Sequence, residues 1–278
     1  IGDPAFLDGI LREGDVEAVI HFAGSVVVPE SVSNPLKYYE NNTAKSRTLI
    51  AKTVEYGVGN FIFSSTAAVY GNVGDEPVVE TVPKVPESPY GWSKLMVEQI
   101  LADTAAAHDF RYTSLRYFNV AGADTKGRTG QSTKGATHLI KVACETAAGK
   151  RPSMEVFGTD YPTRDGTCVR DYIHVTDLVD AHYLALKRLR SGGESLTANC
   201  GYGSGYTVLE VIEAVKRVSG KDFEVTMSPR RIGDAITVVA NPGAALRELG
   251  WKPACDDLDL IVRTALDWEK SLALRNRF

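Results

Sequence analysis

Residues 60–66 have the sequence Asn60-Phe61-Ile62-Phe63-Ser64-Ser65-Thr66, an apolar run that ends in three hydroxyl side chains. Such a run is typical of a strand buried on both faces of a parallel sheet. Similar, mostly apolar runs lie at 16–23, 112–120 and 196–200, and residues 35–56 have the spacing of a helix. Because strand and helix alternate through short connections, the sequence predicts an α/β fold with a doubly wound parallel sheet.

Polar and turn-forming residues gather where three of these strands end. In sheets of this type, ligands bind at the carboxyl ends of the strands. The sequence therefore predicts a ligand site at the edge formed by Phe22-Ala23-Gly24, Ser64-Ser65-Thr66 and Tyr117-Phe118-Asn119.

A tyrosine and a lysine four residues apart follow in the next predicted helix, at 90–107. Tyr90 and Lys94 are expected on the same helix face, because residues four apart lie one above the other. A fixed ammonium favours the phenolate over the neutral phenol, so this pair predicts an acid/base near neutral pH. From the spacing alone, two surface residues of an amphipathic helix remain an alternative.

The overall charge limits the ligands that the chain can attract. With 31 basic and 35 acidic residues, the net charge is −4, so no general positive field draws in nucleic acid or anionic lipid. A phosphate-bearing ligand must then be held by local arginines or backbone amides. The longest apolar run is interrupted by Glu17, His21 and Gly24, which predicts neither a membrane partner nor a signal peptide.

Four cysteines are widely spaced and include no Cys-x-x-Cys pair. Buried free thiols are the better interpretation of such a pattern, and they predict a cytoplasmic protein without a structural metal. The cysteines are Cys144, Cys168, Cys200 and Cys255.

Four motifs together resemble the UDP-glucose 4-epimerases of the extended short-chain dehydrogenase/reductase family. They lie in order at 63–71, 88–94, 116–119 and 166–175, and the resemblance runs from Gly2 to about the final helix. A dehydratase of this family needs an extra acid, typically an Asp-Glu pair right after the strand-end Thr. This chain has Ala67-Ala68 there, which favours an epimerase.

The resemblance implies a Rossmann-like sheet, NAD as cofactor, and interconversion of UDP-glucose and UDP-galactose by transient oxidation at C4. Tyr90 would exchange a proton with the 4-hydroxyl, to which Thr66 would hydrogen-bond. Lys94 would hold the nicotinamide ribose and lower the pKa of Tyr90. The residues implied to contact NAD are Asp3, Phe22, Ala23, Gly24, Asn41, Ser64, Tyr90, Lys94 and Phe118.

The resemblance also implies a set of residues for the UDP-sugar. Arg170 and Arg231 would neutralise the diphosphate through bidentate hydrogen bonds. From the residues alone, Asp3 could equally be a helix N-cap, and His138 could be a core histidine. The implied substrate residues are Thr66, Asn119, His138, Leu139, Val156, Phe157, Arg170, Arg231 and Asp234.

The family opens with a strand and a glycine-rich loop that holds the pyrophosphate, and no such loop follows a first strand here. We therefore expect that the N-terminal strands of the Rossmann sheet are absent, and that residues 1–278 alone do not bind NAD tightly. Residues 1–121 with about 171–203 would form the remainder of the NAD-binding domain. Residues of about 122–170 and 204–278 would form a smaller, mixed α/β substrate lobe.

Two alternatives stay open. The substrate could be another UDP-sugar: an N-acetylhexosamine, which Val238 would leave room for, a uronic acid or a pentose. A non-catalytic, truncated relative that only binds UDP-sugars is the other. The predicted helices at 35–56 and 90–107 flank the sheet and, in the family, pair into a dimer contact, so we expect a homodimer.

Overall fold

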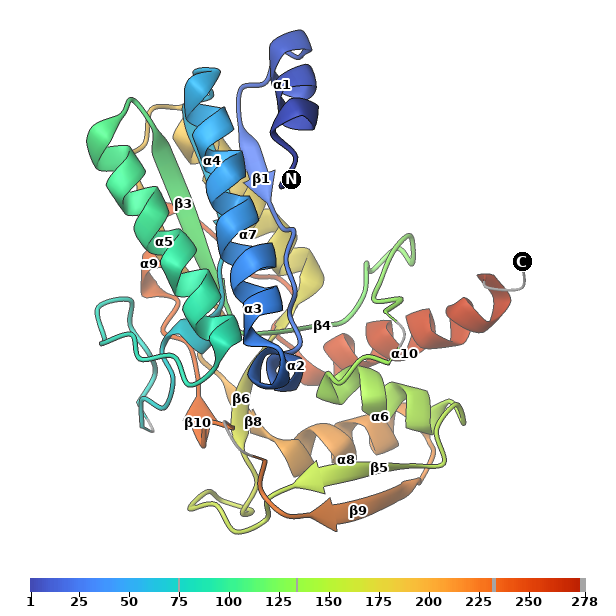
Figure 1. The fold of residues 1–278 in the computed structure, drawn as a ribbon. Coiled ribbons are helices and arrows are strands. Elements are labelled where there is room, and N and C mark those ends of the chain that lie inside the picture. Colours follow the sequence, from blue (N-terminus) through green and yellow to red (C-terminus); the bar gives the residue numbers. More distant parts are fainter. Residues whose placement is uncertain (75, 134, 232–233, 276–278) are drawn as a thin grey trace.

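A four-stranded parallel sheet is the centre of the upper part of the molecule in Figure 1. The computed structural model describes residues 1–74, 76–133, 135–231 and 234–275. The sheet confirms the predicted α/β fold class. Its strands, in spatial order, are β1 (Val19–His21), β2 (Asn60–Ser64), β3 (Arg111–Tyr117) and β7 (Leu196–Cys200), each parallel to its neighbour.

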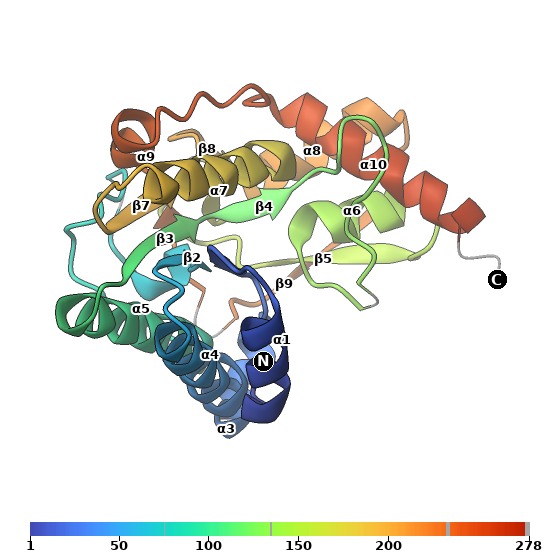
Figure 2. The same cartoon turned by 90° about the horizontal axis from the view of Figure 1, so that it is seen from above.

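Helices cover both faces of this sheet, as Figure 2 shows. Phe61 and Phe63 of β2 enter the core on one face and Ile62 enters the core on the other, because successive strand residues point in opposite directions. This confirms that β2 is buried on both sides. The first face carries α1 (Pro4–Glu13), α4 (Lys45–Glu55) and α5 (Pro89–Ala107), and the second carries α7 (Val175–Arg190) and α9 (Gly243–Glu248).

The helix predicted at 35–56 is interrupted in the structure. Its middle is a π-helical segment, and Asn42 on that segment is buried and hydrogen-bonded to Ser25 and Ser93. The order along the chain is α2 (Val28–Ser33), α3 (Pro35–Tyr38), the π segment η1 (Tyr39–Ala44) and α4. Insertions of this kind are frequent at functional sites, because they turn one side chain inward.

Smaller sheets and three further helices form the lower part of Figure 1. Helices α6 (Leu139–Ala147), α8 (Val208–Ser219) and α10 (Leu258–Arg275) pack together around a second core. Strand β6 (Val169–His174) pairs with β4 (Asn119–Ala121), β8 (Gly205–Thr207) and β10 (Thr237–Val238), and β5 (Ser153–Phe157) pairs with β9 (Glu224–Ser228). The division into a cofactor domain and a substrate lobe stays a prediction.

Two details differ from the sequence-based expectation. The predicted strand at 112–120 divides at Phe118, because β4 leaves the first sheet and pairs with β6. The predicted buried strand at 16–23 shortens to β1, which pairs only with β2 among the described residues and leaves Ile20 39% exposed.

The four cysteines are buried and free, as predicted. In the part of the chain that the structure describes, every helix is too short or too polar to cross a membrane.

Candidate active site

Helix α5 begins directly over the turn that follows β2. The Ser88 hydroxyl caps the helix by accepting a hydrogen bond from Gly91 N at 3.2 Å, and Pro89 occupies its first turn. A Cβ atom on Gly91 would lie 2.5 Å from the carbonyl oxygen of Ala68. The glycine therefore lets the start of α5 approach the turn at 66–68.

Tyr90 and Lys94 lie at the start of this helix and are both buried, 6% and 2% exposed. The Lys94 ammonium donates a hydrogen bond of 2.8 Å to the carbonyl oxygen of Ser64, at the end of β2. The Tyr90 hydroxyl makes a polar contact with the side chain of Thr66, two residues after Ser64, and this contact favours the ionised phenol. The alternative of two surface residues is therefore wrong.

Burial dominates the electrostatics of the pair. It raises the pKa of Tyr90, and the polar contact with Thr66 opposes that rise without overcoming it. Burial also lowers the pKa of Lys94 to about 8, although the nearby carboxylate of Glu98 favours its charged form. That Lys94 lowers the pKa of Tyr90 stays a prediction.

The turn after β1 approaches the same lysine. A Cβ atom on Gly24 would lie 3.6 Å from Lys94 Nζ and 3.1 Å from Asn42 Oδ1. The Asn42 side chain holds this turn by accepting from Ser25 N at 2.7 Å and donating to the Ser25 carbonyl at 3.0 Å. Sequence reasoning chose Asn41, whose amide donates to the Ser25 hydroxyl at 3.0 Å, and missed the more buried Asn42.

The remaining residues implied for NAD are not all directed at one point. The Ser64 hydroxyl lies 2.7 Å from His182 Nε2, on the face of the sheet covered by α7, so only the Ser64 carbonyl reaches Lys94. Phe22 lies against the ring of His182 in a tilted arrangement, with 4.6 Å between the ring centroids. Asp3 caps α1 by accepting from Ala5 N and Phe6 N. Phe118 is buried against Ala67 and Val238.

These residues fit the nicotinamide end of a dinucleotide. An ammonium has three donors, and among the described residues Lys94 uses one of them, toward Ser64. Its charge adjoins the backbone at Gly24, where the absence of a Cβ leaves space for a ligand. Lys94 could therefore hydrogen-bond a ribose hydroxyl beside the turn at 22–24.

A second group of predicted residues meets around the loop before β10. The Arg231 guanidinium lies over the ring of Phe157, 4.5 Å from its centroid, and its Nε donates to Asp234 at 2.9 Å. Arg170 donates to the carbonyl oxygens of Ala235 and Ile236 at 2.6 and 3.2 Å. The structure thus brings four predicted residues together, with the two guanidiniums attached to one loop.

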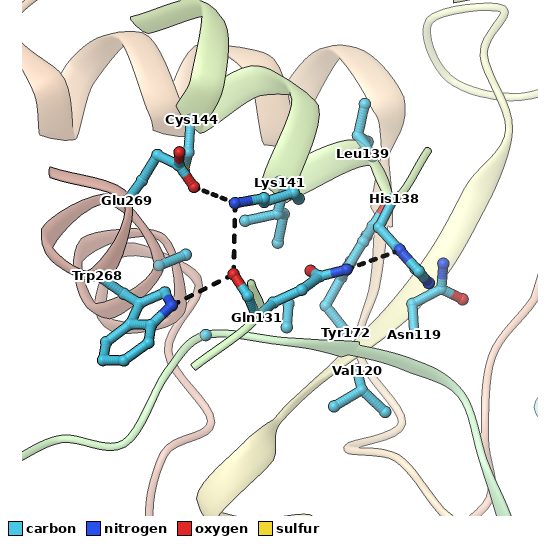
Figure 3. A pocket seen from close by; sticks show the side chains of 14 residues that line it. Asn119, Val120, Gln131, His138, Leu139, Lys141, Cys144, Tyr172, Trp268 and Glu269 are labelled. Atoms are coloured by element: carbon cyan, nitrogen blue, oxygen red, sulfur yellow. Dashed lines mark hydrogen bonds and ion pairs between the residues drawn. The ribbon is translucent and has the colours of Figure 1, made fainter. Parts of the chain in front are cut away.

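A third group lines a small cavity of about 30 Å³ between α6 and β4, shown in Figure 3. Asn119, His138 and Leu139 belong to its wall, as do Gln131 and Tyr172, which sequence reasoning missed. Gln131 Nε2 lies 3.0 Å from His138 Nδ1. His138 is exposed overall, but partial desolvation of its ring lowers its pKa, which favours the neutral imidazole.

Val156 is the one predicted substrate residue whose side chain points away from these groups. It is 1% exposed and packs into the core formed by α6, α8 and α10. The alternation of β5 explains this, since Val156 points inward while the next residue, Phe157, points to Arg231.

The sequence pattern of the NAD dependent epimerase/dehydratase family matches residues 1–201. This chain belongs to that family. The resemblance described above is thereby confirmed. The buried Tyr90 and Lys94 lie at the carboxyl ends of the parallel strands, where ligands bind in sheets of this type.

Individual relatives agree with the family assignment. The UDP-glucose 4-epimerase of Azospirillum brasilense is 56% identical over 98% of this chain and 78% of its own length. A crystal structure of UDP-glucose-4-epimerase from Stenotrophomonas maltophila, with bound NAD and formylated UDP-arabinopyranose, has a TM-score of 0.94 at 41% identity, covering 98% of this chain and 82% of that one. The UDP-Glc/GlcNAc 4-epimerase of Campylobacter jejuni has a TM-score of 0.82 at 48% identity, covering 97% and 82%.

The polar contact between Thr66 and Tyr90 makes a direct prediction about the acidity of Tyr90. In this epimerase-family protein without ligand, Tyr90 should titrate above its ordinary pKa of 10.0, and Thr66→Val should raise that pKa further by removing the hydroxyl that opposes the effect of burial. Ultraviolet absorbance of tyrosinate, taken as a difference from Tyr90→Phe, measures it. Thr104→Val removes a hydroxyl from the same helix far from Tyr90 and should change nothing. A Tyr90 pKa that is unchanged or lower in Thr66→Val would contradict the assignment.

Proposed function

We propose that this protein is a UDP-glucose 4-epimerase, which interconverts UDP-glucose and UDP-galactose with NAD as its cofactor. The observation that carries the proposal is the buried Tyr90, in polar contact with Thr66 and one helical turn before Lys94. Curated relatives with this activity in their names are up to 56% identical to the chain and span most of its length. Ala67 and Ala68 begin a buried turn after Thr66 where a dehydratase would carry acids.

Each residue of the pair has a separate task in the reaction. When bound, NAD accepts hydride from C4 of the sugar and returns it. Tyr90 takes the proton of the 4-hydroxyl in one step and gives it back in the other, so one residue serves both directions. Thr66 orients the hydroxyl, and the Lys94 ammonium stabilises the phenolate that forms when the site is closed to water.

Epimerisation also requires that the keto sugar presents its other face before it is reduced. The nucleotide must therefore be held firmly while the hexose is held loosely. We assign the firm contacts to Arg170 and Arg231, whose paired charges suit a diphosphate, and to Phe157 beside them. Asn119, His138, Leu139 and Asp234 complete the proposed contacts with the nucleotide.

A wider substrate range has one specific support. The structure from Campylobacter jejuni, 48% identical to this chain, is described as a UDP-Glc/GlcNAc 4-epimerase. Val238 is a small side chain, and it pairs with Arg170 across β10 and β6. We propose that UDP-N-acetylglucosamine is a second substrate, while uronic acids and pentoses have no comparable support.

Conversion of UDP-galactose by the full-length protein with NAD bound tests the activity. Tyr90→Phe should lower kcat by about 10²- to 10⁴-fold, because it removes the proton carrier and keeps the ring. The matched control Tyr183→Phe, on the exposed side of α7, should retain wild-type turnover. A wild-type protein that holds NAD but converts no UDP-sugar would favour the non-catalytic alternative. Turnover of UDP-glucose but not of UDP-N-acetylglucosamine would contradict the proposal of a wider substrate range.

We also propose a cytoplasmic homodimer. Four buried free thiols support the location. Support for the dimer comes from two exposed apolar residues on α5, Trp92 and Met96, of which Met96 lines a broad surface hollow. That hollow is lined by Tyr39, Thr43, Ala44, Arg47, Thr48, Met96 and Ile100.

Sedimentation analysis of the full-length protein tests the dimer. The wild type should have the mass of two chains, and Met96→Glu should shift it toward one chain, because the contact would bury an unpaired charge. Met227→Glu, on exposed β9, should leave the dimer intact. A wild-type monomer, or a Met96→Glu dimer as stable as the wild type, would contradict the proposal.

A further inference from the structure

Helix α5 places a third buried polar residue on the face that carries Tyr90 and Lys94. Glu98 follows Lys94 by four residues and is 7% exposed. Arg116 of β3, 4% exposed, holds its carboxylate from two directions: Nε donates at 3.0 and 3.2 Å, and Nη2 donates at 2.6 Å. A buried carboxylate persists only when it is paired this completely, so the position of Glu98 is strongly determined.

Glu98 is also bound to the end of β2, because the Ser65 hydroxyl donates to its Oε1. Three successive residues of that strand end thus each pair with one turn of α5. Lys94 donates to the carbonyl of Ser64, Glu98 accepts from the Ser65 hydroxyl, and the Tyr90 hydroxyl is in polar contact with Thr66. These three pairs, which we call the α5 ladder, connect the helix that carries the proton-transfer residue to the strand end that carries its partner.

We propose that Glu98 is a positioning residue for the epimerase reaction: through Ser65 and Arg116 it fixes α5 against the end of β2, and thereby holds Tyr90 and Lys94 in register with Thr66. The inference rests on the proposed function. Glu98 touches neither substrate nor cofactor in this scheme and acts only through the other members of the α5 ladder.

The contacts of Arg116 show why α5 is held in a fixed position against the end of β2. Its Nη1 donates to the Tyr70 hydroxyl at 2.9 Å and to the carbonyl of Glu80 at 3.2 Å. The Tyr70 hydroxyl in turn donates to Asn199 of β7 at 2.6 Å. The Glu98–Ser65 pair of the ladder is therefore joined through Arg116 to β3 and, through Tyr70, to β7.

Glu98 also supplies negative charge close to Lys94. Its carboxylate favours the protonated form of a lysine whose pKa burial lowers to about 8. His21 of β1 faces the same ammonium and stays neutral, because burial and Lys94 lower its pKa to about 4. Other titratable or charged groups of the described residues also lie near Glu98 and the Tyr90–Lys94 pair. Tyr38 of α3 and Tyr117 of β3 face Tyr90, and Arg116 and Tyr112 of β3 face Glu98.

Three variants of the full-length protein with NAD bound distinguish the effect of Glu98 on the position of α5 from the effect of its charge on Lys94. Ser65→Ala removes one pair and no charge, so kcat should fall by about 10- to 100-fold while KM for UDP-galactose changes little. Glu98→Gln should lower kcat similarly and also move the alkaline limb of the kcat–pH profile to lower pH, because the Lys94 proton is then lost more easily. Glu98→Asp keeps the charge and should restore the wild-type alkaline limb.

The control for general destabilisation is Asp177→Asn. The Asp177 carboxylate is buried on α7 and accepts from Ala254 N and Cys255 N, far from α5 in the sequence. This variant should lower the unfolding temperature without moving kcat or the alkaline limb. Glu98→Gln with a lowered unfolding temperature but wild-type kcat and pH profile would show a merely structural role and overturn the proposal.

The proposal can still be tested if Glu98→Gln does not fold or if the wild-type protein is inactive. If Glu98→Gln does not fold, wild-type kcat in Ser65→Ala overturns it. If the wild-type protein converts no UDP-sugar, the proposed function fails on its own, and the ultraviolet titration of Tyr90 still tests the ladder without turnover. Ser65→Ala should raise the pKa of Tyr90, because a loosened strand end weakens the contact of Tyr90 with Thr66. An unchanged pKa would overturn the claim that Glu98 positions Tyr90.

Discussion

The contact between one face of α5 and the end of β2 is the constraint on which the site depends. It forces a phenol, an ammonium and a carboxylate out of water, and each of them is tolerated because the strand end offers it a matched partner. The close approach needs Gly91, since a side chain there would meet the carbonyl of Ala68. The packing of α5 against the end of β2 therefore also determines where the reactive groups lie.

Burial has a clear electrostatic consequence in the protein without ligand. It raises the pKa of Tyr90 and lowers that of Lys94, so both groups are pushed toward their neutral forms. The same desolvation strengthens every charge interaction inside the closed site. A phenol that resists ionisation until its surroundings are complete is suited to transfer a proton only when the sugar hydroxyl is in place.

Local patterns predicted the parts of this protein that depend on local sequence. The structure contains the strand predicted from the apolar run at 60–64 and the alternation of strands and helices. It also places Tyr90 and Lys94 on one buried helix face, as their spacing predicts. Features set by long-range contacts did not follow from the sequence: the inward turn of Asn42, the division at Phe118 and the buried Val156. Glu98 continued the spacing of four residues, but only its pairing with Arg116 distinguishes it from a surface carboxylate.

The central claim is that a hydrogen leaves C4 and returns to the same carbon, while Tyr90 moves only the hydroxyl proton. The most direct test uses UDP-galactose deuterated at C4 with the full-length protein in ordinary water. We predict that the UDP-glucose formed retains the deuterium at C4 and that product formed in deuterated water acquires none there. Loss of the label to solvent would show that the C4–H bond is broken by proton abstraction, and would contradict this account.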